Sequence, residues 1–364
     1  MFIILFIVIL AALVFVHELG HFLAAKISGI RADEFALGFP PRLFSFKWGE
    51  TVYALNLIPF GGYVKIFGED PNDESIAGPD KERSFVHKPK SIQAFVLVAG
   101  ILGNIIFAWL LLSLGFMIGM PVPKDYSDTA KVQNAKITIT LVSAGSPAEK
   151  AGIKVGDVVT KLSAASDTVA TADIETYQNF IAQHPQQEIT VSYIRNNEAH
   201  DLTVVPKEGI VSGRPAIGVA FELLGTLKLS FFSAFIEGAK LTWVVIQGTA
   251  IGLYQFLLQI VTGHANFSQV SGPVGIAGLV GDAGRLGLVY LLSFTAFISV
   301  NLAIINLIPF PALDGGRLLF VLIEKIKGSP ITPRIANAFN GIGLALLLLL
   351  MAIVTFHDLL KIFY

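Results

Sequence analysis

Apolar residues in this chain gather in long runs that polar stretches separate. Four runs stand out, over residues 2–25, 92–120, 286–308 and 340–357. Each reaches the roughly 20 residues that a helix needs to cross a hydrocarbon core about 30 Å thick. We therefore predict a polytopic α-helical membrane protein with about four transmembrane helices.

The first run has a second interpretation, as a secretory signal peptide. No Lys or Arg precedes it, no clear A-x-A cleavage site follows it, and it is long for the apolar part of such a peptide. We therefore expect a retained transmembrane helix. A further uncharged stretch covers residues 241–261, and its place depends on the topology.

A polar segment, residues 124–208, separates the second run from the third. Within it, alternating apolar and polar residues predict half-buried strands over 136–142, 188–194 and 199–205. Asn196 and Asn197 predict a hairpin turn between the last two strands, and residues 173–183 predict a helix. We expect a small water-soluble α/β domain inserted between membrane helices.

Residues 31–90 are polar and rich in Gly and Pro, and they predict a β-hairpin around Gly49. A further extended piece, 63–67, follows Gly61 and Gly62. We therefore divide the chain into four parts. Residues 1–123 hold the first two membrane helices and this membrane-associated hairpin region, and residues 124–210 form the inserted domain. Residues 211–284 hold a linker and an interfacial or re-entrant helix, and residues 285–364 hold the last two membrane helices.

Composition supports the membrane prediction and narrows the chemistry. Of the residues, 53% are hydrophobic and 15% are charged, against about 25% charged in soluble chains. A net charge of −1 gives no basis for nucleic-acid binding. Cys is absent, which excludes disulfides and thiolate metal sites. Any transition metal must therefore be held by His, Asp or Glu.

The first membrane run contains the sequence His17-Glu-Leu-Gly-His21. Two His four residues apart lie on one face of a helix, at a spacing that suits two imidazole ligands on Zn²⁺, and Glu18 is placed to activate a bound water. The alternative is a chance pattern at a polar helix end. Ionisable groups inside a membrane helix are costly and mark function, so we favour a metal site.

Catalytic zinc usually has three protein ligands, so a third must come from elsewhere. Residues 306–316 begin at the inner end of the third run. In this segment Pro309 and Pro311 cannot continue a helix, and the two glycines after Asp314 permit backbone shapes barred to other residues. A non-helical loop at membrane depth must be buried in protein or line a wet cavity. Asp314 could be a helix cap, but beside an incomplete two-His site we favour a metal ligand.

With both motifs in view, the sequence resembles the intramembrane zinc proteases of the site-2 protease family, in the bacterial branch that contains the regulator-of-sigma-E protease. His17 to His21 matches the family's HExxH, and residues 306–316 match its NxxPxPxLDGG. Other matching stretches are 58–65, 271–276 and 142–159, the last of which resembles a PDZ domain. The chain departs from the family's AGPxxN at Ile101, and it has room for one PDZ domain where many relatives carry two.

The resemblance implies a set of site residues. The implied ligands of one Zn²⁺ per chain are His17, His21 and Asp314, with Glu18 as the general base and Asn306 as the residue that stabilises the transition state. Substrate-binding residues are expected at Gly61, Gly62 and Tyr63, in a segment implied to be an edge strand that holds substrate, and at Asn104. The glycines are also an ordinary turn signal, and Asn104 also suits a polar contact between packed helices.

The implied activity is cleavage of transmembrane segments of single-span membrane proteins, such as anti-sigma factors or remnant signal peptides that another protease has already trimmed. A non-catalytic membrane scaffold that uses the PDZ-like domain as receptor is the alternative, but a scaffold has no need of Glu18 between two metal-binding His. A metal transporter would need ligands at several depths, and the sequence shows one cluster. Two roles are possible for the PDZ-like domain: it binds peptide termini, or it acts as a size filter for substrates.

Basic residues near the helix ends predict the orientation. They lie after the first run and before the second at Lys26, Arg31, Lys88 and Lys90, and between the third and fourth at Arg317, Lys325, Lys327 and Arg334. These loops are expected in the cytoplasm of a bacterial cell, with the active site toward the cytoplasmic side of the inner membrane and the inserted domain outside. Both metal motifs then meet on one side only if 231–262 lies along or dips into the outer membrane surface.

Overall fold

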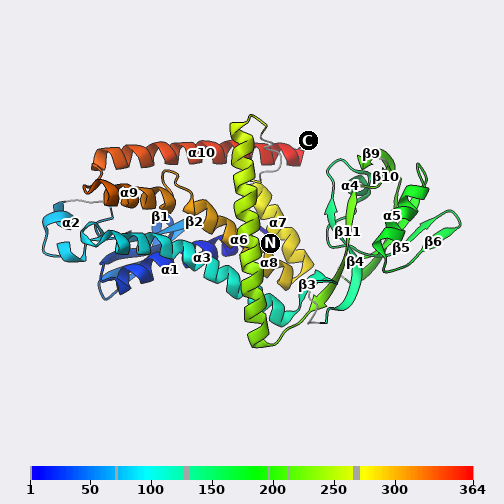
Figure 1. Cartoon of the computed structure of the whole chain (residues 1–364), viewed down its shortest axis with the longest axis horizontal. Coiled ribbons are helices and arrows are strands. Elements are labelled where there is room, and N and C mark those ends of the chain that lie inside the picture. The colour runs from blue at the N-terminus through cyan, green and yellow to red at the C-terminus, as the bar shows by residue number, and fades with distance from the viewer. Residues whose placement is uncertain are drawn as a thin grey trace. The chain divides into compact units, whose positions relative to one another are not determined.

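The computed structural model describes residues 2–69, 73–126, 131–195, 197–211, 214–264 and 271–363 (Figure 1). The chain forms two compact units. The membrane unit comprises Met1–Leu114, Phe235–Gly284 and Tyr290–Tyr364. The β unit comprises Gly115–Ala234 and Arg285–Val289.

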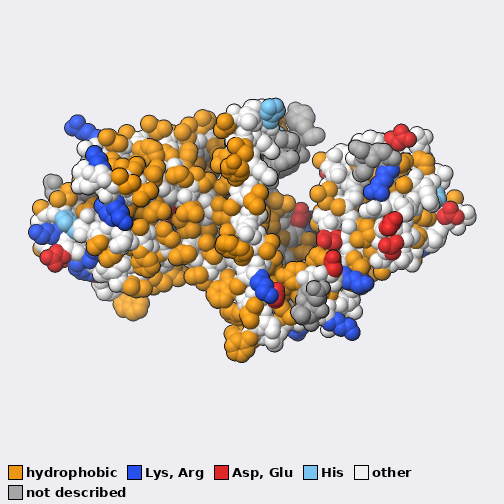
Figure 2. All heavy atoms as spheres, in the orientation of Figure 1, with side chains coloured by type: hydrophobic (Ala, Val, Ile, Leu, Met, Phe, Trp, Pro, Cys, Tyr) orange, Lys and Arg blue, Asp and Glu red, His pale blue; other side chains and the backbone are white. Residues whose placement is uncertain are grey.

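Among the residues that the structure describes, five helices are long and apolar enough to cross a membrane. They are α1 (Phe2–Ile27), α3 (Lys90–Ile118), α6 (Phe231–Val261), α8 (Leu288–Leu307) and α10 (Pro333–Phe363). The sequence predicted about four, and the additional candidate is α6, which contains the uncharged stretch 241–261. None of the residues in its most apolar window is buried. Large apolar side chains such as Trp243 and Ile251 are exposed on it, and Figure 2 shows apolar side chains over most of the visible surface of the membrane unit.

The predicted hairpin is confirmed, with β1 (Ala32–Trp48) paired to β2 (Thr51–Ile66) around Gly49. The pairing is more complex than a simple hairpin, because residues 34–37 pair with both 52–55 and 62–65 of β2. Residues 42–48 pair with 51–56 from the other side. The extended piece expected at 63–67 is therefore the end of β2, and it lies at an edge of this small sheet.

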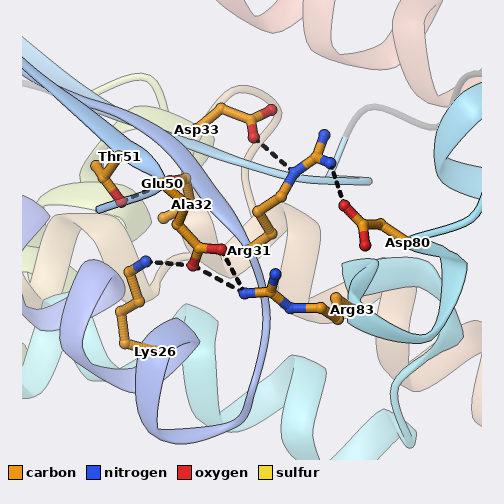
Figure 3. Close-up of polar contacts among 8 residues, drawn as sticks. All are labelled: Lys26, Arg31, Ala32, Asp33, Glu50, Thr51, Asp80 and Arg83. Carbon is orange, nitrogen blue, oxygen red and sulfur yellow. Dashed lines mark hydrogen bonds and ion pairs between the residues drawn. The ribbon is translucent and has the colours of Figure 1, made fainter. Parts of the chain in front are cut away.

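A polar network fastens the turn of this sheet to the end of α1 (Figure 3). Lys26 Nζ lies 2.5 Å from Glu50 Oε1, and Arg83 Nη2 lies 2.6 Å from Glu50 Oε2, so the two cations hold the carboxylate between them. Arg31 Nη1 donates to Asp80 Oδ2 at 2.6 Å nearby. The hydrogen bond from Lys26 and the contact with Arg83 hold the pKa of Glu50 below its usual value.

Glycines let α1 and α3 approach each other closely. A Cβ atom at Gly20 would lie 2.2 Å from the carbonyl oxygen of Ala99, and one at Gly103 would lie 2.8 Å from that of Val16. No larger residue fits without moving a backbone, since real Cβ atoms do not come this close. The turn of α1 that carries the two histidines therefore lies directly against α3.

The loop between α8 and α9 (Asp314–Lys327) shows a different use of glycine from the one expected. Gly315 and Gly316 lie in helical backbone at the start of α9, without a positive φ. Their Cβ atoms would lie 2.2 Å from the carbonyl oxygens of Ile308 and Phe310, respectively. These glycines are needed for space, because the loop folds back over the first turn of the helix.

The stretch 271–276 begins α7 (Pro273–Leu286), and its glycines have a structural role as well. Gly275 N donates to Oδ2 of Asp358, a buried carboxylate of α10, at 2.8 Å. A Cβ at Gly272 would lie 2.8 Å from the same oxygen. A carboxylate at the start of a helix satisfies free N–H groups there, so this stretch joins α7 to α10.

The β unit holds a seven-stranded sheet in the order β3-β11-β4-β5-β7-β8, with β6 paired to β5. Its strands are β3 (Met120–Pro123), β4 (Gln133–Val142), β5 (Val158–Ala164), β6 (Asp167–Val169), β7 (Ile189–Arg195), β8 (Glu198–Val204) and β11 (Val219–Leu227). A separate pair is β9 (Lys207–Val211) with β10 (Arg214–Ala216). The unit also holds α4 (Pro147–Ala151) and α5 (Ile174–Gln183), while the short helix α2 (Asp73–Ala77) and the 3-10 helices η1 (Lys81–Arg83) and η2 (Phe85–His87) belong to the membrane unit.

The three predicted strands and the predicted helix of this unit are confirmed as β4, β7, β8 and α5. Arg195 pairs with Glu198, so a two-residue turn joins β7 to β8 as expected. Of the two turn residues, Asn197 has a φ of 66°, and Asn196 lies outside the described residues. The fully buried ring of Tyr177 packs against the core of this sheet.

Candidate metal centre

Helix α1 places both histidines of the HExxH motif against α3. The side chains of His17 and His21 are one turn apart and buried, and their Nε2 atoms are 3.2 Å apart. The i, i+4 spacing puts both rings on one face of the helix, as the sequence predicts. Glu18, between them, lines a cavity with both rings.

Asp314 comes to the same point from the first turn of α9. Its Oδ2 atom lies 3.1 Å from His17 Nε2 and 3.3 Å from His21 Nε2. Among the residues that the structure describes, these three form the one group of at least three His, Asp or Glu side chains that could share a metal ion. The sequence therefore identified all three members.

The geometry of the group fits zinc. A tetrahedral Zn²⁺ with bonds of about 2.0–2.1 Å keeps its ligand atoms about 3.3 Å apart. The three atoms here form a nearly equilateral triangle with sides of 3.1, 3.2 and 3.3 Å. Asp314 Oδ2 is buried and has no hydrogen-bond partner, which leaves its lone pairs for a cation.

Contacts behind the triangle fix both rings. His21 Nδ1 lies 2.8 Å from the carbonyl oxygen of Val96, and His17 Nδ1 lies 3.3 Å from Nδ2 of Asn104. Gly100 makes room for His21, because a Cβ there would lie 2.2 Å from its Nε2. Val96, Gly100 and Asn104 are each four residues apart, so one stripe of α3 supports both histidines.

The other predicted site residues occupy different positions around the centre. Asn306 Nδ2 lies 3.5 Å from His17 Nε2, at the end of α8. Gly61 has a φ of +123° at the bend of β2, and its Cβ would lie 2.5 Å from the Phe39 ring. Gly62 packs toward α1, where a Cβ would lie 3.5 Å from Glu18 Cγ. Asn104 is fully buried, so it has no exposed surface to offer a substrate.

A cavity of about 740 Å³ contains the centre. Residues 63–69 at the end of β2 line it, and so do the start of α9 and residues 340, 341 and 344 of α10. Tyr63 faces the cavity, and its hydroxyl donates to Glu34 Oε1 at 3.0 Å. Burial, with the Glu34 carboxylate, raises the pKa of the Tyr63 hydroxyl, so it remains a hydrogen-bond donor.

The cavity also holds cations that the sequence analysis did not assign to the site. Arg31, Lys65 and Arg317 line it, and Arg317 forms an ion pair with Glu69. Arg317 entered the sequence analysis only as a marker of orientation. Its position three residues after Asp314, on the same helix face, is the signal that would have placed it here.

A buried His-His-Asp triangle with a neighbouring Glu, in a chain with several helices able to cross a membrane, defines a membrane zinc metalloprotease. Residues 5–350 match the model of peptidase family M50, and the chain belongs to that family. It is an intramembrane zinc metalloprotease, and Zn²⁺ is its cofactor.

Curated relatives match over nearly their whole length. The chain is 30% identical to the regulator of sigma-W protease RasP of Bacillus subtilis, with 99% of each chain covered. It is 31% identical to the zinc metalloprotease RasP of Geobacillus kaustophilus, with 99% of this chain and 98% of that one covered. A third relative, the zinc metalloprotease RasP of Oceanobacillus iheyensis, is 30% identical with 98% of each chain covered.

Proposed function

We propose that this protease cleaves transmembrane segments of single-span membrane proteins, with Glu18 as the general base. The observation that carries this proposal is that Glu18 shares one cavity with the His17, His21 and Asp314 side chains. The name of the Bacillus subtilis relative, a regulator of sigma-W protease, favours anti-sigma factors as substrates. Remnant signal peptides are the other substrate class that the proposal includes.

The proposed chemistry assigns a role to each side chain at the centre. Zn²⁺ would be held by His17, His21 and Asp314. It would supply a Lewis acid, which lowers the pKa of water toward neutrality and polarises a carbonyl. Glu18 takes a proton from the attacking water on its carboxylate and delivers it to the nitrogen of the leaving amine. Asn306 Nδ2, beside the centre, donates a hydrogen bond to the oxyanion that develops on the scissile carbonyl.

We propose that substrate binds as an added strand along β2. Gly62 to Lys65 pair with β1 on one side, and among the described residues no other strand pairs with them on the other. Tyr63 to Ile66 line the cavity that holds the metal centre. A substrate that pairs with this edge is unwound from its helix, and its peptide bonds become accessible to the centre.

Orientation and domain roles belong to the same proposal. The basic loops favour an active site toward the cytoplasmic side of the bacterial inner membrane and a β unit outside. Helix α6 lies along the outer surface, in support of which Figure 1 shows it running across the direction of α3 and α10. The proposed division of the chain is 1–123, 124–210, 211–284 and 285–364, and the second part is a PDZ-like domain. This domain either binds peptide termini or excludes substrates that another protease has not trimmed.

The test compares Glu18→Gln with wild type in full-length protein, using cleavage of a model transmembrane substrate and the zinc content. General-base catalysis contributes roughly 10²–10⁴-fold, so we expect at least about 100-fold slower cleavage. Zinc content should remain one per chain, because Glu18 is not in the ligand triangle. Glu175→Gln in the β unit is the matched control and should cleave normally. Normal cleavage by Glu18→Gln would refute the general-base role of Glu18, and no cleavage by the zinc-loaded wild type would favour a scaffold.

A further inference from the structure

Helix α3 contacts the second ring nitrogen of each histidine in the triangle. At His21 the contact fixes the proton, because Nδ1 lies 2.8 Å from the Val96 carbonyl oxygen, which can only accept. His21 Nδ1 therefore carries the hydrogen, and its Nε2 lone pair points to the other two ligand atoms. An outer contact of this kind fixes the tautomer and orientation of a metal-binding histidine.

The same requirement applies to His17, but its partner is a side chain. If His17 Nε2 binds the metal, its Nδ1 must carry the hydrogen and the atom opposite must accept it. Asn104 lies there, with its amide 3.3 Å from His17 Nδ1. The amide presents Nδ2, a donor, whereas Asn104 Oδ1 is buried and has no hydrogen-bond partner.

A half-turn of the amide removes this mismatch. The two ends of an Asn amide have nearly the same shape, and the hydrogen-bond network decides which faces which way. The rotation breaks no hydrogen bond of Oδ1, since it has none, and gives it the N–H of His17. Ser299 Oγ donates to the backbone carbonyl oxygen of Asn104 at 2.8 Å, so α8 holds this part of α3 in place without engaging the side-chain amide.

We propose that Asn104 is a positioning residue, which accepts the His17 Nδ1–H through its Oδ1 and thereby directs Nε2 at the zinc. The inference rests on the proposed ligand role of His17. Asn104 is fully buried, so no solvent competes for this bond and the residue acts through His17. Together with the Val96 carbonyl, it makes one helix the outer shell of both histidine ligands.

The test measures zinc retention by full-length protein in detergent, as the rate of zinc transfer to a chromogenic chelator. Asn104→Leu keeps the size but cannot accept, and we expect about 10–100-fold faster loss of zinc. Asn104→Asp can only accept, and it should retain zinc at least as well as wild type. Asn301→Leu is the matched control, because the Asn301 amide donates to the backbone of its own helix, at the Phe297 carbonyl oxygen. It should release zinc at the wild-type rate.

A purely structural role for Asn104 predicts a different pattern. In that case Asp, a buried charge, would be as damaging as Leu, and equal zinc loss in both variants would overturn the inference. Wild-type zinc retention by Asn104→Leu would overturn it as well. The variant His17→Ala separates this inference from the proposed ligand set. If His17→Ala keeps zinc as wild type does, the ligand set itself is wrong. If His17→Ala loses zinc while Asn104→Leu keeps it, only the role of Asn104 is refuted.

Discussion

Gly100 lies against the ring of His21 and sets how close α3 can come to the metal centre. A Cβ at this position would lie 2.2 Å from His21 Nε2, one of the three candidate ligand atoms. Overpacking of this kind displaces the neighbouring side chain or the backbone, at a cost of about 1–3 kcal/mol. The absence of a side chain here is therefore a requirement of the site.

We predict that Gly100→Ala weakens zinc binding, because His21 must move out of the triangle. The expected change is about tenfold or more in zinc affinity, measured by competition with a chelator. Gly248→Ala on α6 is the control, because a Cβ at Gly248 meets nothing within 4 Å. Wild-type affinity in Gly100→Ala would show that His21 is not held at the distance seen in the structure.

Asp314 supplies the only oxygen of the triangle, and we predict that Asp314→Ala loses zinc. Removing one of three protein ligands leaves two imidazoles, too few for a stable catalytic zinc site. Zinc content per chain after gel filtration is the measurement. Asp33→Ala removes another acid from the same cavity, where it pairs with Arg31, and should keep its zinc. Unchanged zinc in Asp314→Ala would exclude this residue as a ligand.

At the scale of elements, the β1–β2 sheet carries the candidate substrate edge into the cavity. Its position depends on the turn, where Glu50 is held by Lys26 of α1 and Arg83 of η1 (Figure 3). The sequence predicted the turn at Gly49 correctly. The double pairing of residues 34–37 could not be predicted, because it depends on bends in both strands that bring distant residues together.

We predict that Glu50→Gln loosens this sheet in a pH-dependent way. The pKa of Glu50 is lowered in the folded protein, so its contribution is fully present above the unfolded value of 4.5 and is lost as the pH falls through the lower folded value. Partly exposed ion pairs contribute about 0.2–1 kcal/mol each. Amide hydrogen exchange of residues 32–66 should be up to about fivefold faster than in wild type at pH 7.

The pH series gives the sharper result for Glu50. The difference between Glu50→Gln and wild type should shrink below pH 4.5 and vanish once Glu50 is protonated in both states. Glu82→Gln on η1 is the control and should exchange like wild type. A difference that persists unchanged at low pH would mean that the charge of Glu50 does not hold the sheet.

For the whole molecule, the number of membrane crossings decides whether the two metal motifs share a side. Within the described ranges, five helices are long and apolar enough to cross. If one of them crossed between α3 and α8, then α1 and α8 would run in opposite directions. With α6 on the outer surface, α1 and α8 run in the same direction. The ends of both helices then meet on one side of the membrane, as the contact between His17 and Asp314 requires.

We predict that residue 264, just after α6, lies outside the cell. The chain has no Cys, so single cysteines report without background. In intact cells stripped of their outer layers, a membrane-impermeant maleimide should label His264→Cys and Lys207→Cys, the latter in the β unit. It should label Lys325→Cys, in the last turn of α9, only when the cells are broken. Labelling of position 264 only in broken cells would mean that α6 crosses the membrane.

The sequence by itself determined the membrane class, three strands and one helix of the β unit, and the three residues of the metal triangle. These features depend on local rules, since hydrophobic length, strand alternation and the i, i+4 spacing are properties of a single segment. A third ligand could be found because the absence of Cys and the need for a third donor left few candidates.

Only the tertiary structure decided what surrounds those residues. The stripe of Val96, Gly100 and Asn104 behind the histidines, and the edge of β2 in the cavity, join segments far apart in the chain. The two glycines after Asp314 are another case, because their role is space under a returning loop. Such contacts follow from how elements pack, and the pattern along one segment contains no information about its neighbours in space.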